Sequence, residues 1–310
     1  MTLALDIILI LLTLAVAVGT IASRDNYAAV IAFIGFGLLL GLVWVRLSSV
    51  DVALTEMAIG GGATGILLLR ACARLRFANP NVAQPGTGLR IVAGLLCAGV
   101  SVAIGVVVLA LPQPPVTLAP QAAEHMAASG LENPVTVVLL VYRAFDTLLE
   151  KIVLVLALVG VWSLATERFW GGAPAEINPG PVDPPLALLA VLLPPVGIVF
   201  GIYVVWAGAD EPGGTFQGGA VLAGMWLLVL MARLREMPQT GSGALRLSIA
   251  AGPLLFLLVG YSGFFLAGSF LAYPDGFAKP IIIAVEFALT VSIAVIIGLL
   301  VAGPAARAPK

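Results

Sequence analysis

Charged side chains interrupt the apolar runs of this sequence, and their spacing makes them candidates for proton or ion chemistry. Arg143, Asp146, Glu150 and Lys151 lie within one long apolar run, and Glu56 lies inside an earlier one. A charge at the centre of a bilayer costs at least about 2.5–3.5 kcal/mol, so such residues usually pair with each other or line a pathway. These residues are therefore predicted to form an ion or proton path.

The spacing of the central group predicts which side chains act together. Arg143, Asp146 and Glu150 are three and four residues apart and share one helix face. Lys151 points about 100° away and is expected to pair elsewhere. An alternative stays open for Arg143 and Asp146, which in that case only neutralise each other at the interface.

A further candidate pair lies near the end of the chain, where Glu286 follows Lys279 by two helical turns. The two residues share a helix face, with Glu286 roughly 10 Å inside the last apolar run. A single glutamate in an apolar helix needs a partner. Either Lys279 reaches it along the helix, or the partner belongs to another subunit.

Glycines follow two of the acidic sites. After Glu56 come Gly60, Gly61, Gly62 and Gly65, and after an acidic turn come Gly214, Gly218 and Gly219. Each glycine weakens a helix by about 1 kcal/mol relative to alanine. The first set predicts either close helix packing or a helical bulge, and the second predicts close helix–helix approach.

The elements that position these residues follow from composition. The 310 residues are 61% hydrophobic and only 10% charged, with a mean hydropathy of +1.12. Soluble domains carry about 45–50% apolar and about 25% charged residues, so the chain is predicted to be an all-α integral membrane protein. Two cysteines and one histidine argue against a metal site or a metal cofactor, and a net charge of -1 gives no sign of a nucleic-acid partner.

About nine apolar runs are long enough to span a bilayer, which needs about 20 residues. They lie near 3–21, 28–45, 52–69, 91–111, 135–165, 186–206, 214–234, 247–270 and 280–302. The fifth run is too long for an upright span, so it is expected to tilt, bend or begin with a lateral segment.

The distribution of positive charge predicts an N-out, C-in orientation. With the loop after the third span in the cytoplasm, eleven of the 15 Lys and Arg residues lie inside, two lie outside and two lie within a span. Cytoplasmic loops carry an excess of such residues. The predicted inside set is Arg24, Arg70, Arg74, Arg76, Arg90, Arg168, Arg233, Arg235, Arg246, Arg307 and Lys310.

Four regions are predicted along the chain. Residues 1–78 form a module of three spans, and residues 79–170 form a second module of two spans. Residues 171–185 are a linker rich in Gly and Pro, which cannot continue a helix. Residues 186–310 form a domain of four spans.

Three motifs resemble known families. Asp51-Val-Ala-Leu-Thr-Glu56-Met-Ala-Ile-Gly60 resembles the short Mbh-type hydrogenase membrane-subunit domain, which also occurs in the C-terminal extension of the large Mrp antiporter subunit. Tyr142-Arg143-Ala-Phe-Asp146-Thr-Leu-Leu-Glu150 resembles the module that usually follows it. The Pro-Gly-Gly-Thr-Phe-Gln-Gly-Gly core at 212–219 resembles the MnhB-like subunit of Mrp-type cation/proton antiporters. The third span is also similar to the bulged helix of the J-type subunit of respiratory complex I.

The resemblance implies a membrane subunit of an Mrp-type Na+/proton antiporter, without catalysis of its own and without a cofactor. It implies large antiporter-like subunits, a K-type small subunit and other small Mrp subunits as partners, Na+ and H+ as transported ions, and a bacterial plasma (inner) membrane location. The carboxylates that it marks as path residues are Glu56, Asp146, Glu150 and Glu286. The alternatives are the membrane arm of a redox-driven pump related to membrane-bound hydrogenase or complex I, and a purely structural scaffold.

Overall fold

The computed structural model describes residues 2–78, 86–112, 116–177 and 180–309. Pro179, Lys310 and the side chain of Arg76, on which the sequence predictions also drew, lie outside this described part. Throughout it the chain is helical and has no β-strand, only an isolated bridge between Pro174 and Ala305. This confirms the predicted all-α class.

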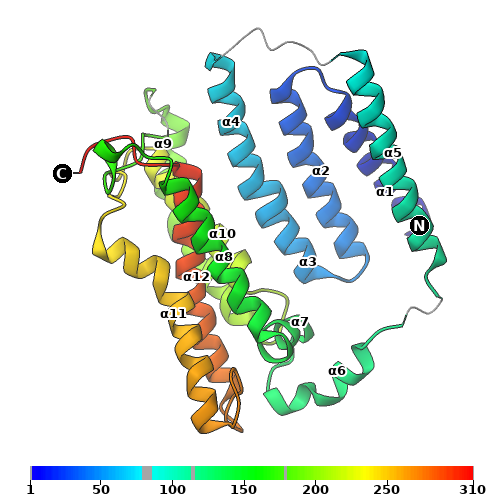
Figure 1. Cartoon of the computed structure of the whole chain (residues 1–310), viewed down its shortest axis with the longest axis vertical. Helices are drawn as coiled ribbons and strands as arrows, with labels where there is room; N and C mark the ends of the chain where they lie inside the picture. Colours follow the sequence, from blue (N-terminus) through cyan, green and yellow to red (C-terminus); the bar gives the residue numbers. More distant parts are fainter. Residues whose placement is uncertain (1, 79–85, 113–115, 178–179, 310) are drawn as a thin grey trace.

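The N-terminal helices form a group of their own (Figure 1). They are α1 (Thr2–Ala22), α2 (Asn26–Arg46), α3 (Val50–Thr55), the π-helix η1 (Glu56–Ala63) and α4 (Thr64–Ala78). The last three are continuous, so the third predicted span is one long helix with a π-helical middle. An ion pair between Asp6 and Arg46, 2.7 Å long, joins the start of α1 to the end of α2.

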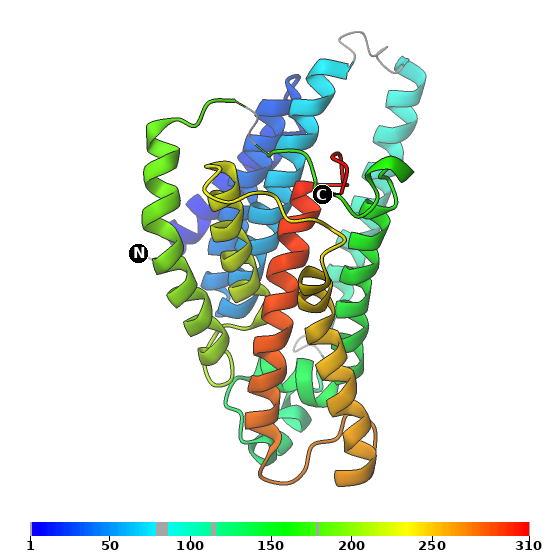
Figure 2. The same ribbon diagram turned by 90° about the vertical axis from the view of Figure 1, so that its left-hand side faces the viewer.

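Most of the remaining helices form a second group around α12, drawn in red in Figures 1 and 2, whereas α5 (Thr87–Ala110) lies at the edge of the molecule on the side of the N-terminal helices. After α5 come α6 (Ala119–Met126), η2 (Ala127–Ser129), α7 (Pro134–Val137) and the π-helix η3 (Val138–Tyr142). The chain continues with α8 (Ala144–Trp162), η4 (Glu167–Phe169), α9 (Pro184–Ala207), α10 (Thr215–Met231), α11 (Gly243–Leu266) and α12 (Ala278–Ala302).

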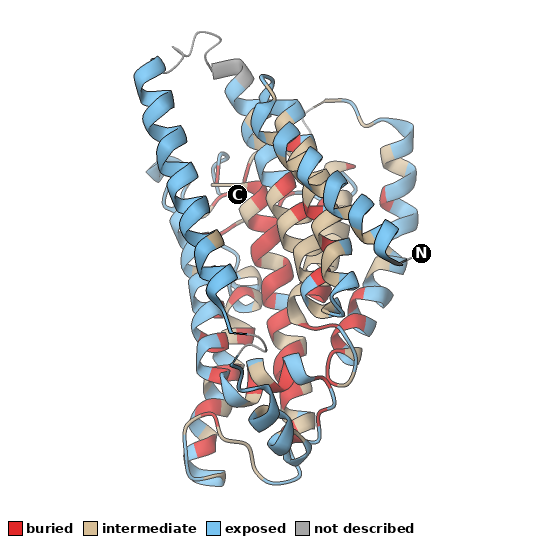
Figure 3. Cartoon of the chain, turned by 90° about the vertical axis from the view of Figure 1, so that its right-hand side faces the viewer, coloured by how far each residue is buried: buried red, intermediate tan, exposed pale blue. Residues whose placement is uncertain are grey.

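The core follows α12, which packs against α8, α10 and α11. Most of the fully buried large side chains belong to this helix, among them Ile282, Leu289 and Ile296 (Figure 3). By contrast, α5 has no buried residue and lies at the edge of the molecule. The chain alone therefore leaves a whole apolar helix for lipid or for other subunits.

Glycines allow the closest helix contacts. A Cβ on Gly37 of α2 would lie 3.1 Å from the backbone of Gly61 in η1. A Cβ on Gly218 of α10 would lie 2.8 Å from the carbonyl oxygen of Gly201 in α9. Both contacts match the small-residue interfaces that bring membrane helices together. Gly60, Gly61 and Gly62 of the first set lie in the π-helix η1, and Gly61 is also in the close contact with α2, so both options left open by the sequence occur there.

Seven described helices are long and apolar enough to cross a membrane: Leu3–Ala22, Asn26–Arg46, Val50–Leu75, Thr87–Ala110, Pro184–Ala207, Gly243–Leu266 and Ala278–Ala302. The two other predicted spans coincide with α10, which is a shorter apolar helix, and with the segment from α7 to α8. The count of nine and the N-out orientation stay predictions.

The fifth predicted span is bent, as its length suggested. The π-helix η3 ends at Tyr142, and Arg143, with a φ of −124°, breaks the helix before α8 begins. Two side chains satisfy the carbonyls freed at the break: the Thr147 hydroxyl donates to Leu139 O at 2.6 Å, and the Tyr273 phenol donates to Leu140 O at 2.9 Å. Burial raises the pKa of Tyr273 above its ordinary value, which keeps this phenol protonated as a donor.

Candidate functional site

Two buried charged residues from different helices mark the site. Lys151 of α8 and Glu286 of α12 are each 3% exposed. Each lies about two turns, or roughly 10 Å, beyond the start of its helix. Both line one cavity of about 260 Å³, called here the central cavity. Charged side chains are seldom this buried unless they are paired or functional.

The ammonium group of Lys151 is held between an aromatic ring and a neighbouring carboxylate. It lies 3.7 Å from the ring centroid of Phe216 in the first turn of α10. It also lies 3.5 Å from Oε2 of Glu150, whose side chain is 49% exposed. A cation over an aromatic face is attracted by the ring quadrupole, most strongly when it is desolvated. Lys151 therefore has partners on α10 and on its own helix α8, and the expectation that it pairs elsewhere than with Glu150 is wrong for this structure.

Glu286 has no such partner on Oε2, which is buried and without a hydrogen bond to any described residue. No described lysine or arginine forms an ion pair with this carboxylate. Of the two partners that the sequence left open for Glu286, Lys279 is not the one in this structure, because its ammonium binds both oxygens of Asp210 at 2.7 Å. A buried carboxylate without a partner carries a large desolvation cost.

Asp51 ties the N-terminal helices to the loop that precedes α10. Its Oδ1 accepts from the backbone N–H of Gly213 at 3.0 Å and from the Asn133 side-chain amide at 3.3 Å. The Gln217 side-chain amide of α10 donates to Thr55 Oγ1 at 3.0 Å and to the carbonyl oxygen of Asp51 at 3.4 Å. Asp51 and Thr55 lie one turn apart, on one face of the helix that starts at Val50.

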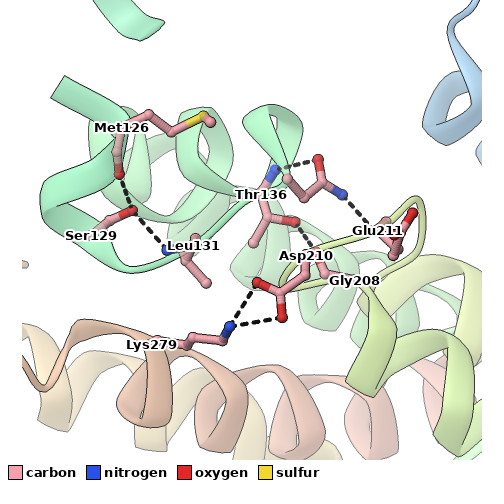
Figure 4. A network of polar contacts seen from close by, with 9 residues as sticks. Met126, Ser129, Leu131, Thr136, Gly208, Asp210, Glu211 and Lys279 are labelled. Atoms are coloured by element: carbon pink, nitrogen blue, oxygen red, sulfur yellow. Dashed lines mark hydrogen bonds and ion pairs between the residues drawn. The ribbon is translucent and has the colours of Figure 1, made fainter. Parts of the chain in front are cut away.

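A second cavity of about 310 Å³ adjoins the first, and Asp51 lines both. It is also lined by Asp210 and Glu211 and is called the adjoining cavity. The polar network beside it is drawn in Figure 4, where Lys279 meets Asp210 and the Thr136 hydroxyl donates to Gly208 O at 2.6 Å. The two cavities together lead from an acidic rim toward Lys151 and Glu286.

An apolar layer lies on the other side of the central cavity. Ala223, Ile293 and Ile297 are buried there, and Ile59 and Ala63 of η1 pack against them. Ile293 and Ile297 lie beyond Glu286 along α12, toward the end of that helix.

The remaining predicted path residues lie apart from the central cavity. Arg143 and Asp146 pair with each other, Nε to Oδ2 at 2.6 Å, on a surface where their side chains are 70% and 54% exposed. Glu56 lies in η1 and does not line the cavity. A Cβ on Gly37 would lie 3.7 Å from its Oε1, which places the carboxylate at the α2–η1 contact.

Sequence reasoning missed Asp51, Thr55, Phe216 and Gln217 as lining residues. Each lies inside a motif that the sequence had already marked, either before Glu56 or within the glycine-rich start of α10. The spacing of Asp51 and Thr55 on one helix face was a usable signal. The pairing of two helix starts from distant parts of the chain was not, because no local pattern encodes it.

Two family models match the chain. Residues 11–76 match the MbhD subunit of MBH, and residues 185–306 match the domain related to the MnhB subunit of Na+/H+ antiporter. An uncharacterized protein of Methanocaldococcus jannaschii is 30% identical over 156 residues, which are 46% of this chain and 60% of that protein. The matched part thus spans less than two thirds of this relative.

Solved structures share the fold. A chain of the Mrp complex from Dietzia sp. DQ12-45-1b matches with a TM-score of 0.76 at 24% identity, over 98% of this chain and 35% of that one. A chain of the membrane-bound sulfane sulfur reductase, an archaeal respiratory membrane complex, matches with a TM-score of 0.54 at 24% identity, over 69% of this chain and 97% of that one. Several apolar helices and these likenesses make the chain a multi-pass membrane protein. The chain thus combines a region similar to MbhD at 11–76 with a domain related to MnhB at 185–306.

Proposed function

We propose that this chain is a membrane subunit of an Mrp-type cation/proton antiporter complex, with Na+ as the exchanged cation and with no catalysis of its own. The observation that carries the proposal is the burial of Lys151 and Glu286 around one cavity. The MnhB-related domain supplies Glu286, and the segment between the two matched domains supplies Lys151. An ion path lined by both Lys151 and Glu286 would require the MnhB-related domain and the segment before it to be joined.

In the proposed mechanism, Lys151 changes its carboxylate partner. Its ammonium now lies 3.5 Å from Glu150, while Glu286 lines the same cavity. When the ammonium approaches Glu286, it stabilises the ionised carboxylate; when it returns to Glu150, Glu286 requires a proton or another cation. The apolar layer around Ile293 keeps this step from becoming a leak.

The test uses the whole complex in everted membrane vesicles. We expect Glu286→Gln and Lys151→Met each to lower cation/proton exchange at least tenfold, about 1.4 kcal/mol on the limiting barrier. Glu167→Gln, in the short helix η4 away from the cavity, serves as the control. Native gels check assembly. Normal exchange by assembled Glu286→Gln complexes would exclude the pathway.

A second candidate is the membrane arm of a redox-driven pump related to membrane-bound hydrogenase or complex I. The likeness to the sulfane sulfur reductase, which is described as a respiratory membrane complex, favours it. Genes for hydrogenase or dehydrogenase proteins beside the gene for this chain would support this candidate. A scaffold role is the third candidate, and unchanged exchange in both cavity variants would support it.

We also propose the partners and the location. Large antiporter-like subunits, a K-type small subunit and other small Mrp subunits are the expected neighbours, in a bacterial plasma membrane. The helix α5, which has no buried residue, is one place where such a neighbour would pack. Affinity purification of the tagged chain in mild detergent, followed by mass spectrometry, checks these partners.

A further inference from the structure

Two oxygen atoms converge on the residue that precedes α10. A Cβ on Gly214 would lie 3.2 Å from Gln217 Oε1 and 3.8 Å from Glu286 Oε1. The backbone φ of Gly214 is +141°, a conformation that side-chain-bearing residues rarely adopt. Because this residue has no side chain, no Cβ occupies the position near both oxygens. Gln217 and Glu286 both line the central cavity.

The orientation of Gln217 is fixed by its hydrogen bonds. Its amide nitrogen donates to Thr55 Oγ1 at 3.0 Å and to Asp51 O at 3.4 Å. The carbonyl end of the same amide is therefore left on the side of Gly214, as an acceptor that needs a donor or a cation. No described residue donates a side-chain hydrogen bond to Gln217 Oε1.

The charges of the cavity favour an added cation. Asp51, Glu150 and Glu286 contribute three carboxylates, against the single ammonium of Lys151. That ammonium is engaged with Glu150 and with the ring of Phe216. Glu286 lines the cavity and is only 3% exposed. Its Oε2 is buried and accepts no hydrogen bond from any described residue.

We propose that Gln217 and Glu286 form a binding site for a small monovalent cation of the Na+ type. Neutral and charged oxygens without nitrogen or sulfur are the ligands that hard cations prefer. A single charge suits one otherwise unpaired carboxylate. The acidic adjoining cavity attracts the ion, and Asp51, which lines both cavities, marks the passage between them. The inference deepens the proposed function, on which its transport role rests.

The test measures equilibrium binding of ²²Na+ to the purified complex in detergent, which requires no transport. We expect the wild-type complex to bind one more Na+ than the Glu286→Gln complex. In the Gln217→Met complex, whose side chain has similar length but no oxygen, the dissociation constant of that Na+ should rise at least fivefold. Gln239→Met, near the other end of the molecule, is the matched control and should bind as wild type does.

Identical Na+ binding by wild-type, Glu286→Gln and Gln217→Met complexes would overturn the site. If Gln217→Met does not assemble, Gln217→Glu decides instead, because its added carboxylate should tighten Na+ binding and an unchanged affinity would contradict the proposal. A complex that binds Na+ at this site but exchanges no protons retains the inference and refutes the antiport function. If the wild-type complex exchanges cations and protons normally but the Gln217→Met complex binds Na+ as the wild type does, the antiport function is retained and the proposed site is refuted.

Discussion

At the scale of the residue, Glu150 and Lys151 are neighbours in sequence with opposite environments. Lys151 is buried beneath the first turn of α10, while the Glu150 side chain is half exposed at the rim of the same cavity. Consecutive residues on a helix differ in direction by about 100°, which the sequence already indicated. The outcome is a carboxylate that reaches a buried ammonium from outside the core.

This arrangement makes a prediction for Glu150. Glu150→Gln removes the carboxylate that lies 3.5 Å from Lys151, so the ammonium loses its ion pair. We expect the complex to assemble but cation/proton exchange in everted vesicles to fall at least tenfold, about 1.4 kcal/mol. Leu149→Gln adds an amide one residue away and should have a much smaller effect. Normal exchange in assembled Glu150→Gln complexes would leave this residue a structural partner.

Individual charged residues could be selected from the sequence, but most of their contacts could not. Glu286 and Lys151 stood out because a charge inside an apolar run is costly. Their surroundings come from Asp51 and Gln217, which lie on other helices, and no local pattern encodes that these helix starts meet. The pairing of Lys279 with Asp210 likewise depends on how a distant loop folds back over α12.

At the scale of the element, the glycines of α10 differ sharply in their surroundings. A Cβ on Gly218 would meet the Val205 side chain and the Gly201 carbonyl oxygen of α9, whereas Gly224 has nothing within 4 Å. The sequence predicted close approach from the spacing of Gly214 and Gly218, which lie at the start of the helix. It did not predict which neighbour α10 would approach.

These glycines provide a matched pair of substitutions. We expect Gly218→Ala to destabilise the complex by about 1–3 kcal/mol, because overpacking forces α9 and α10 apart. Gly224→Ala should be neutral, or stabilising by up to about 1 kcal/mol through better helix propensity. Thermal unfolding of the purified complex, followed by tryptophan fluorescence, compares the two. Equal melting temperatures for both variants would contradict the close α9–α10 contact.

The two π-helices lie where the sequence predicted irregular helix geometry. Four glycines after Glu56 predicted packing or a bulge, and η1 occupies that position. The excess length of the fifth apolar run predicted a bend, which occurs at Arg143. The place of the bend was not predicted, and one of the carbonyls freed there accepts a hydrogen bond from Tyr273, a residue far along the chain.

At the scale of the whole molecule, the predicted topology places the two ends of the bundle on opposite sides of the membrane. The C-terminal ends of α4 and α12 lie toward one end in Figure 1, and α6 lies at the other. Positive charge predicts that the first end is cytoplasmic. The packing of the helices is compatible with this topology but does not determine which end faces the cytoplasm.

Cysteine labelling in intact cells determines which end of the bundle is cytoplasmic. In a background without Cys72 and Cys97, Ser242→Cys before α11 should resist a membrane-impermeant maleimide, whereas Ala123→Cys in α6 should react. After lysis, both should react because both positions are exposed. Labelling of Ser242→Cys in intact cells would reverse the assignment.

The hydrogen bonds of Asp51 have a consequence for the synthesis of the chain. Its partner Gly213 is 162 residues away, so the third helix leaves the ribosome long before that amide exists. At translation rates of about 5–20 residues per second, the delay is on the order of ten to thirty seconds. During that time Asp51 must remain at the aqueous boundary or be shielded by an insertion factor. Nascent chains that stop before α10 should therefore be preferred substrates of membrane proteases.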